Sequence, residues 1–231
     1  MYDLAVALAR SAWLFVSVVP RAVLYALWWT PPPEWPRPVT PATRTVVVLL
    51  HGVNQRHAVW KVAVERLLPH IPADCAVYAP FFNHNDDPLG ALADAVQREI
   101  EPHVKRGLAA RIVGFSNGGR IAMYIQRDMP GDHTFVLVGA PVRGTHLLRW
   151  LPDALVRAKI SPHLLREMST VRFYPRPGSR IVAFAADYDE MVFPAACCAP
   201  HGTAPRVLRG HMHRTLFRAR EVVAAIAGRD E

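Results

Sequence analysis

The chain has little cysteine, no repeats and no pattern of metal ligands. Of its three cysteines, Cys197 and Cys198 are adjacent, so we expect no disulfide framework, which favours a reducing compartment. Cys75 lies in an apolar run and is expected to be a small buried hydrophobe. No Cys or His spacing typical of a metal site occurs, so we predict no metal and no cofactor. No internal repeat or low-complexity tract is present.

Lysine is also scarce, since it occurs only at Lys61, Lys105 and Lys159. Arginine supplies most of the formal net charge of +8, yet the arginines are scattered, without a run of five and without interleaved aromatics. We therefore expect no nucleic-acid partner; an anionic membrane surface fits the charge better. With 51% hydrophobic and 20% charged residues in 231, the chain suits one globular α/β domain and a short extension.

The extension is an apolar segment at residues 1–30. Its run from Ser11 to Trp29 has about the length of a bilayer span but is interrupted by Pro20 and Arg21. Three interpretations stay open: a membrane anchor or interfacial helix, helices packed on the domain, and a cleaved signal, although no small-residue cleavage site follows. Membrane association, at the bacterial inner membrane, is the localisation we expect, with the cytoplasm as the alternative. A proline-rich linker at 31–42 leads to a catalytic domain at 43–231.

Apolar β-type runs alternate with helical patterns in the catalytic domain. Strands are predicted at Thr45–Leu50, Ala76–Ala79, around Ile112, Thr134–Val138, Ile181–Ala185 and Arg206–Leu208, and helices at His57–Leu68, Leu89–Arg106, from Asn117 and at Thr215–Ala227. This alternation predicts the α/β class, with a mostly parallel central sheet covered by helices on both faces. Catalytic groups should then lie at the carboxyl ends of the strands.

The most informative motif is Gly114-Phe115-Ser116-Asn117-Gly118, a G-x-S-x-G between a predicted strand and a predicted helix. Such a sharp turn exposes a nucleophilic serine and requires small residues two positions before and after it. The composition predicts about 0.02 chance occurrences of this pattern. Ser116 is therefore the predicted nucleophile.

A serine nucleophile needs a histidine base and an orienting acid, which for this turn type follow in the order Ser, acid, His. His213 precedes the terminal helix and is the preferred base, with His211 as the alternative. The acid is sought after the strand at Ile181. Asp189 is preferred there, with Asp187 as the second choice.

The remaining site residues come from two loops. The oxyanion hole requires two backbone amides, for which we predict Asn117 and Val53, the latter from the loop after the first core strand. His51 in that loop is interpreted as a structural histidine that shapes it. The loop Asn83–Asp87 is interpreted as a solvated loop that caps the following helix.

From Thr43 to Gly228 the chain resembles α/β-hydrolases of the lipase and esterase type. The resemblance rests on the serine turn and on short motifs, which are His51-Gly52, Asp189-x-x-Val, His213-x-x-Leu and Gly139–Thr145, the last being similar to G-T-P-x-x-G-T of bacterial triacylglycerol lipases. It implies a small, minimal hydrolase core. A short helical cap at about 143–175 would contain Trp150, Leu151, Leu155 and Ile160 as possible acyl-site residues.

These observations predict a serine hydrolase that cleaves carboxylic esters of small molecules or lipids through an acyl-enzyme, without a cofactor. A thioesterase or amidase on the same residues is the alternative within the class. A non-catalytic, membrane-associated binding protein that keeps the fold is the alternative outside it. The sequence does not indicate an oligomeric state.

Overall fold

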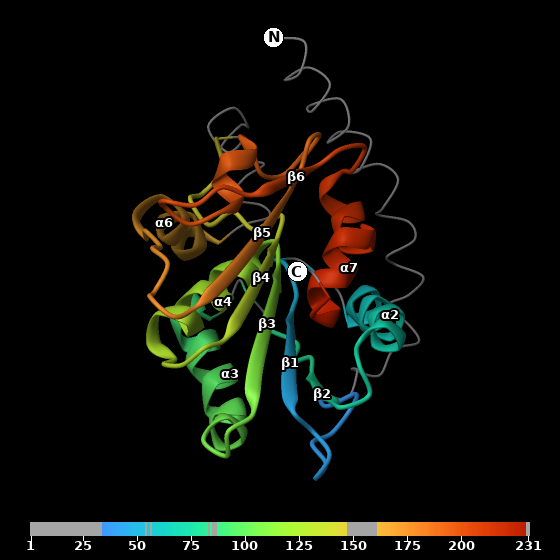
Figure 1. Ribbon diagram of the computed structural model, residues 1–231. Helices are drawn as coiled ribbons and strands as arrows, with labels where there is room; N and C mark the ends of the chain where they lie inside the picture. The colour runs from blue at the N-terminus through green and yellow to red at the C-terminus, as the bar shows by residue number, and fades with distance from the viewer. Residues whose placement is uncertain are drawn as a thin grey trace.

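The computed structural model describes residues 34–53, 55, 57–82, 84, 87–146 and 161–229, without the side chains of residues 57 and 58. The predicted membrane segment at 1–30 and the cap residues Trp150, Leu151, Leu155 and Ile160 therefore lie outside the described residues. In the described part, six strands form one parallel sheet in the order β2-β1-β3-β4-β5-β6 (Figure 1). The predicted α/β fold class is confirmed.

The elements follow one another in the predicted alternation. The strands are β1 (Thr45–Leu50), β2 (Cys75–Tyr78), β3 (Ala109–Phe115), β4 (Thr134–Val138), β5 (Arg180–Ala186) and β6 (Arg206–Leu208). The α-helices are α2 (His57–Leu67), α3 (Leu89–Val104), α4 (Asn117–Asp128), α6 (Pro162–Thr170) and α7 (Arg220–Ala227). The 3₁₀ helices are η1 (Leu68–His70), η3 (Ala195–Cys198) and η4 (His213–Arg218).

Two layers of helices cover the sheet because its central strands are apolar on both faces. Alternate residues of β1 show this: Val46 and Val48 belong to one buried cluster with α3, α4 and α6, whereas Val47 and Leu49 belong to another with α2 and α7. Figure 1 shows these two groups of helices on opposite sides of the sheet. Such strands appear in the sequence as unbroken apolar runs, which explains why they are easy to recognise.

The order of the strands indicates where in the sheet a ligand site is expected. The chain moves from β1 outward to β2, and then crosses back to β3 on the other side of β1. In open α/β sheets, ligands bind at the carboxyl ends of the strands, where this direction reverses. His51 directly follows β1, and Ser116 directly follows β3, so both lie at this edge of the sheet.

The described part of the predicted linker, residues 34–42, starts along the outer edge of the sheet. Arg37 makes an antiparallel bridge with Val77, and its guanidinium donates to the carbonyl oxygens of Leu68 and Pro72 at 2.9 and 2.6 Å. The Trp35 ring lies 4.8 Å from that of Tyr78. The backbone bridge covers the open edge of β2, and the guanidinium satisfies carbonyl groups of η1 and of the loop that follows it.

The C-terminal element differs from its prediction. A single helix over Thr215–Ala227 is wrong, because η4 begins at His213 and Ala219 is extended at φ −62° and ψ 138° before α7 starts. The Thr215 hydroxyl oxygen accepts the Met212 N–H at 2.9 Å, which caps the start of η4 two residues before the predicted helix start. The extended backbone at Ala219 then ends η4 before α7 begins.

Candidate active site

Ser116 occupies a strained turn between β3 and α4. Its backbone is at φ 53° and ψ −124°, and it is the one non-glycine residue with positive φ among the described residues. A side chain at Gly114 would collide with Gly119, and one at Gly118 with the carbonyl oxygen of Leu50. The small residues that the motif analysis requires on both sides of the serine are thus explained by close backbone approach.

His213 and Asp189 form a buried pair behind this turn. The distance from His213 Nδ1 to Asp189 Oδ2 is 3.0 Å, and the two residues are 4% and 7% exposed. The other carboxylate oxygen of Asp189 accepts the backbone N–H groups of Met191 and Val192 at 2.8 and 2.7 Å. The carboxylate is therefore held by three hydrogen bonds, which fix its orientation towards the imidazole.

The protonation of His213 is set by two opposed influences. Burial lowers its pKa, but the neighbouring carboxylates, chiefly that of Asp189, raise it, and the net pKa lies above the ordinary value. Such a ring accepts a proton readily, because the imidazolium that forms lies against a carboxylate.

The turn between β3 and α4 that carries Ser116, here called the elbow, lies next to the His213 imidazole. The ring of Phe115, the residue before Ser116, lies 5.1 Å from the His213 ring, and a side chain at Gly139 would come within about 3.0 Å of His213 Nδ1. The contacts among the described residues include no hydrogen bond between the Ser116 hydroxyl and this ring. Catalytic hydrogen bonds of this kind are often long without substrate and shorten in the complex.

The two second-choice residues are placed elsewhere. Asp187 accepts the Gly210 N–H at 3.0 Å and is exposed, so it closes the turn after β6. His211 lies with its Nδ1 3.5 Å from the Thr215 hydroxyl. The structure brings Asp189 and His213 together, and it joins neither Asp187 nor His211 to this pair.

The predicted oxyanion-hole residues flank the serine from two sides. Asn117 opens α4, so its amide belongs to the positive end of that helix. Val53 lies in the loop after β1, where a side chain on the preceding Gly52 would come within 2.9 Å of Ser116 Cβ. Both segments thus border the space in front of Ser116.

Comparison with solved structures identifies the architecture. A thioesterase of the prodiginine pathway in Streptomyces coelicolor, RedJ, is 18% identical over 87% of this chain and 96% of its own, with a TM-score of 0.57. The peroxisomal alpha-beta-hydrolase Lpx1 of Saccharomyces cerevisiae is 14% identical over 87% and 85%, with a TM-score of 0.56. The chain has the α/β-hydrolase fold.

The other comparisons add less. The chain spans 31% of the length of phospholipase PlaB from Legionella pneumophila, at 17% identity and a TM-score of 0.43. No family model and no curated protein matches the sequence. At these identities the comparisons establish the fold alone, and the chemistry must be argued from the site.

Two buried residues of the site have contacts that motif reasoning did not predict. Glu190, a third carboxylate of the loop in which the catalytic acid is sought, is 1% exposed, and its Oε2 accepts the His213 backbone N–H at 2.9 Å. His84 is 2% exposed. His84 itself is therefore not solvated, and α3 begins after Pro88 without a side-chain cap at that residue. Asn83, Asn85 and Asp86 of the same predicted loop lie outside the described residues. The burial of both residues depends on loops that meet only in the folded chain.

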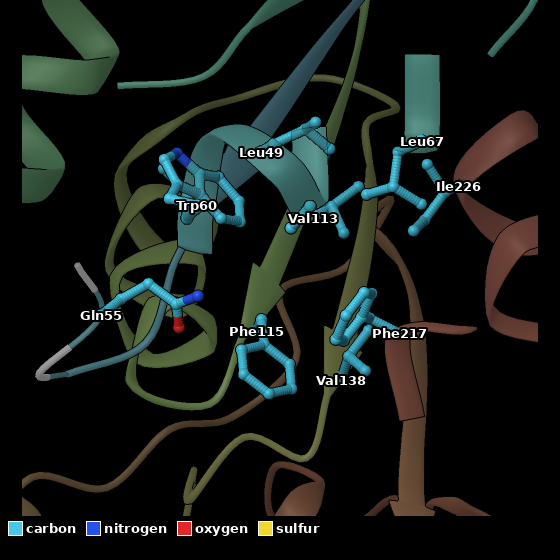
Figure 2. A pocket seen from close by; sticks show the side chains of 11 residues that line it. Leu49, Gln55, Trp60, Leu67, Val113, Phe115, Val138, Phe217 and Ile226 are labelled. Carbon is cyan, nitrogen blue, oxygen red and sulfur yellow. The ribbon is translucent and has the colours of Figure 1, made fainter. Parts of the chain in front are cut away.

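A narrow apolar cavity lies beneath Phe115 on the α2 and α7 side of the sheet (Figure 2). Its volume is about 30 Å³, which is room for a water molecule but not for an acyl chain. Phe217, Trp60 and Val113 contribute to its walls. This space belongs to the packing of the core below the elbow.

The close approach at Gly118 supports a prediction of stability. Gly118→Ala should destabilise the fold by about 2 kcal/mol or more, because the new methyl group would collide with backbone at Leu50 and lie 2.6 Å from the His51 carbonyl oxygen. The measurement is urea unfolding of the variant against wild type. Gly90→Ala is the matched control, since its methyl group meets nothing closer than 4.0 Å and should be neutral or stabilising. Equal stability of the two variants would contradict this account of the elbow.

Proposed function

We propose that the protein is a serine hydrolase that cleaves carboxylic esters, in the manner of a lipase or carboxylesterase. The observation that carries the proposal is the position of Ser116 in a strained strand-to-helix turn beside a buried, hydrogen-bonded His213–Asp189 pair. The fold supports it, because this architecture presents such a turn at the carboxyl ends of its strands.

In the proposed reaction, Ser116 Oγ attacks the ester carbonyl carbon while His213 removes the hydroxyl proton. The negative charge that develops on the carbonyl oxygen is stabilised by the amides of Val53 and Asn117. Collapse of this intermediate breaks the bond to the alcohol, which leaves with the proton from His213. Water then attacks the acyl-enzyme by the same route, and Asp189 stabilises the imidazolium in both halves. No cofactor is required by these steps.

A thioesterase is the second candidate, because RedJ is a thioesterase and another structural neighbour is the type II thioesterase YbtT of the yersiniabactin pathway, matched at a TM-score of 0.56. An amidase would use the same groups. The test is a panel of p-nitrophenyl esters of graded acyl length beside thioesters and anilides of the same acyl groups. We expect the highest kcat/KM on an ester. A clear preference for the thioester would identify the protein as a thioesterase instead of an esterase. No turnover of any substrate would favour a binding protein that keeps the fold.

We propose that residues 1–30 hold the protein at a membrane, which would place a lipid or ester substrate nearby. The motivation is their apolar sequence, interrupted by Arg21, ahead of the catalytic domain. Among the described residues, no helix is both long enough and apolar enough to span a bilayer. The bacterial inner membrane remains the proposed location, with the cytoplasm as the alternative.

The membrane proposal predicts that a variant lacking residues 1–33 no longer floats with anionic liposomes but still hydrolyses p-nitrophenyl butyrate. The truncation ends before Glu34 because Trp35 and Arg37 contact the sheet edge. A variant lacking residues 1–38 is the control and should unfold at a lower temperature, since it also loses these contacts. Full-length protein that ignores liposomes would contradict the membrane role, and so would loss of folding on removal of 1–33.

A further inference from the structure

Three buried polar side chains connect the two segments that border Ser116. His51, His84 and Asn117 are 0%, 2% and 2% exposed. His51 directly precedes the Gly52-Val53 segment, Asn117 opens α4, and His84 comes from the loop between β2 and α3. Polar groups buried to this degree must find hydrogen-bond partners among themselves or in the backbone.

The tautomer of His51 follows from its contacts. The backbone N–H of Phe82 donates to His51 Nε2 at 2.9 Å, so this nitrogen carries no proton. The proton of the neutral ring is then on Nδ1, which lies 2.8 Å from the Gly52 carbonyl oxygen and 3.3 Å from His84 Nε2. The Phe81 ring, stacked at a centroid distance of 4.5 Å, holds the imidazole in this orientation.

His84 is neutral and continues the chain of hydrogen bonds. Burial, together with the neighbouring His51, lowers its pKa to about 3. A hydrogen bond to the His51 backbone acts in the opposite direction, as expected where the ring donates to a carbonyl oxygen. As placed, Asn117 Nδ2 donates to His84 Nδ1 at 3.0 Å, so the proton of the neutral ring is on Nε2, the nitrogen that faces His51. His84 thus contacts His51 through one ring nitrogen and Asn117 through the other.

We propose that His84 is a positioning residue of the oxyanion hole: its neutral imidazole fixes the spacing between the loop that carries Val53 and the helix end that carries Asn117. This role rests on the proposed function. The two segments have no room to rearrange independently, since Gly118 lies against the backbone of Leu50 and His51. A link between them therefore sets the relative position of the two amides.

Loss of the link should impair turnover more than substrate binding. A displacement of about 1 Å at a catalytic group costs up to about a hundredfold in rate, and oxyanion contacts form fully only in the transition state. We expect His84→Phe, which keeps a ring but removes both hydrogen bonds, to lower kcat at least about tenfold with KM within about twofold. His84→Gln, which offers one donor and one acceptor, should restore most of the loss.

The experiment compares kcat and KM of these variants on p-nitrophenyl butyrate. His133→Phe is the matched control. His133 is also buried, and its Nδ1 accepts the Ala110 N–H at 3.3 Å, but this contact lies where β3 begins, far along the strand from Ser116. The control should lose stability and retain kcat. If His84→Phe does not fold, Asn117→Ala removes the other end of the link and should show the same fall in kcat.

A second readout is independent of activity. Long-range ¹H–¹⁵N correlation of the wild-type protein should show His84 as the neutral Nε2–H tautomer, without titration between pH 5 and 8. Titration of His84 within this range, or a kcat of His84→Phe within twofold of wild type, would overturn the positioning role alone. A wild-type protein that hydrolyses no ester and whose serine is not labelled by a fluorophosphonate would instead reject the proposed function.

Discussion

Replacement of Ser116 by alanine is expected to reduce ester hydrolysis by at least about 10³-fold while the fold remains intact. The hydroxyl is the only group removed, and Ser116 is half-buried at the turn, so little packing is lost. The Cβ atom, which faces the open side of Gly52, stays in place. Hydrolysis of p-nitrophenyl butyrate, beside thermal unfolding of both proteins, measures the effect.

Turnover within tenfold of wild type would end the assignment of Ser116 as nucleophile. A large fall in the melting temperature would show instead that the variant disturbs the elbow. Ser169→Ala is the matched control, since that hydroxyl is exposed on α6 and donates to the Arg166 carbonyl oxygen of its own helix, so activity should not change.

The second large effect is expected at the base. His213→Ala should lower kcat/KM by at least about 10³-fold, because His213 is the ring among the described residues that Asp189 holds in place to take the serine proton. His211→Ala should remain within about threefold of wild type, since the His211 ring lies beside Thr215 and is not joined to the Asp189 carboxylate. The two variants are compared on one ester substrate at one pH.

A reversed result, with His211→Ala inactive and His213→Ala active, would move the base and leave the class unchanged. Asp189→Asn separates orientation from packing, because the amide keeps the volume but cannot stabilise the imidazolium. We expect a fall of about 10²- to 10⁴-fold with unchanged folding. An active Asp189→Asn variant beside an inactive Asp187→Asn variant would assign the acid to Asp187.

The layout of the sheet could be predicted because parallel strands that are buried on both faces occur in the sequence as continuous apolar runs. β4 and β6 have the predicted bounds, and so does β1. The terminal helix could not be predicted in the same way. It begins two residues early, where the Thr215 hydroxyl caps Met212, and it is divided by the extended backbone at Ala219.

The site could be predicted to the level of residue type and chain order, since the carboxyl ends of parallel strands converge on one edge. The partner of His213 could not be chosen firmly between Asp187 and Asp189. That choice depends on which side chains a tight turn directs inward, and here two backbone amides orient Asp189. His84 was missed because its burial results from packing between loops that are remote in sequence. The catalytic roles themselves remain predictions.

The measurement that tests the central claim most directly is covalent labelling with a fluorophosphonate, followed by mass analysis of the digested protein. Only a serine activated by a base reacts rapidly with such a reagent. We predict one adduct, on the peptide that contains Ser116, absent in Ser116→Ala and strongly slowed in His213→Ala. No adduct on the folded wild-type protein, or an adduct at another serine with Ser116 unmodified, would contradict the account.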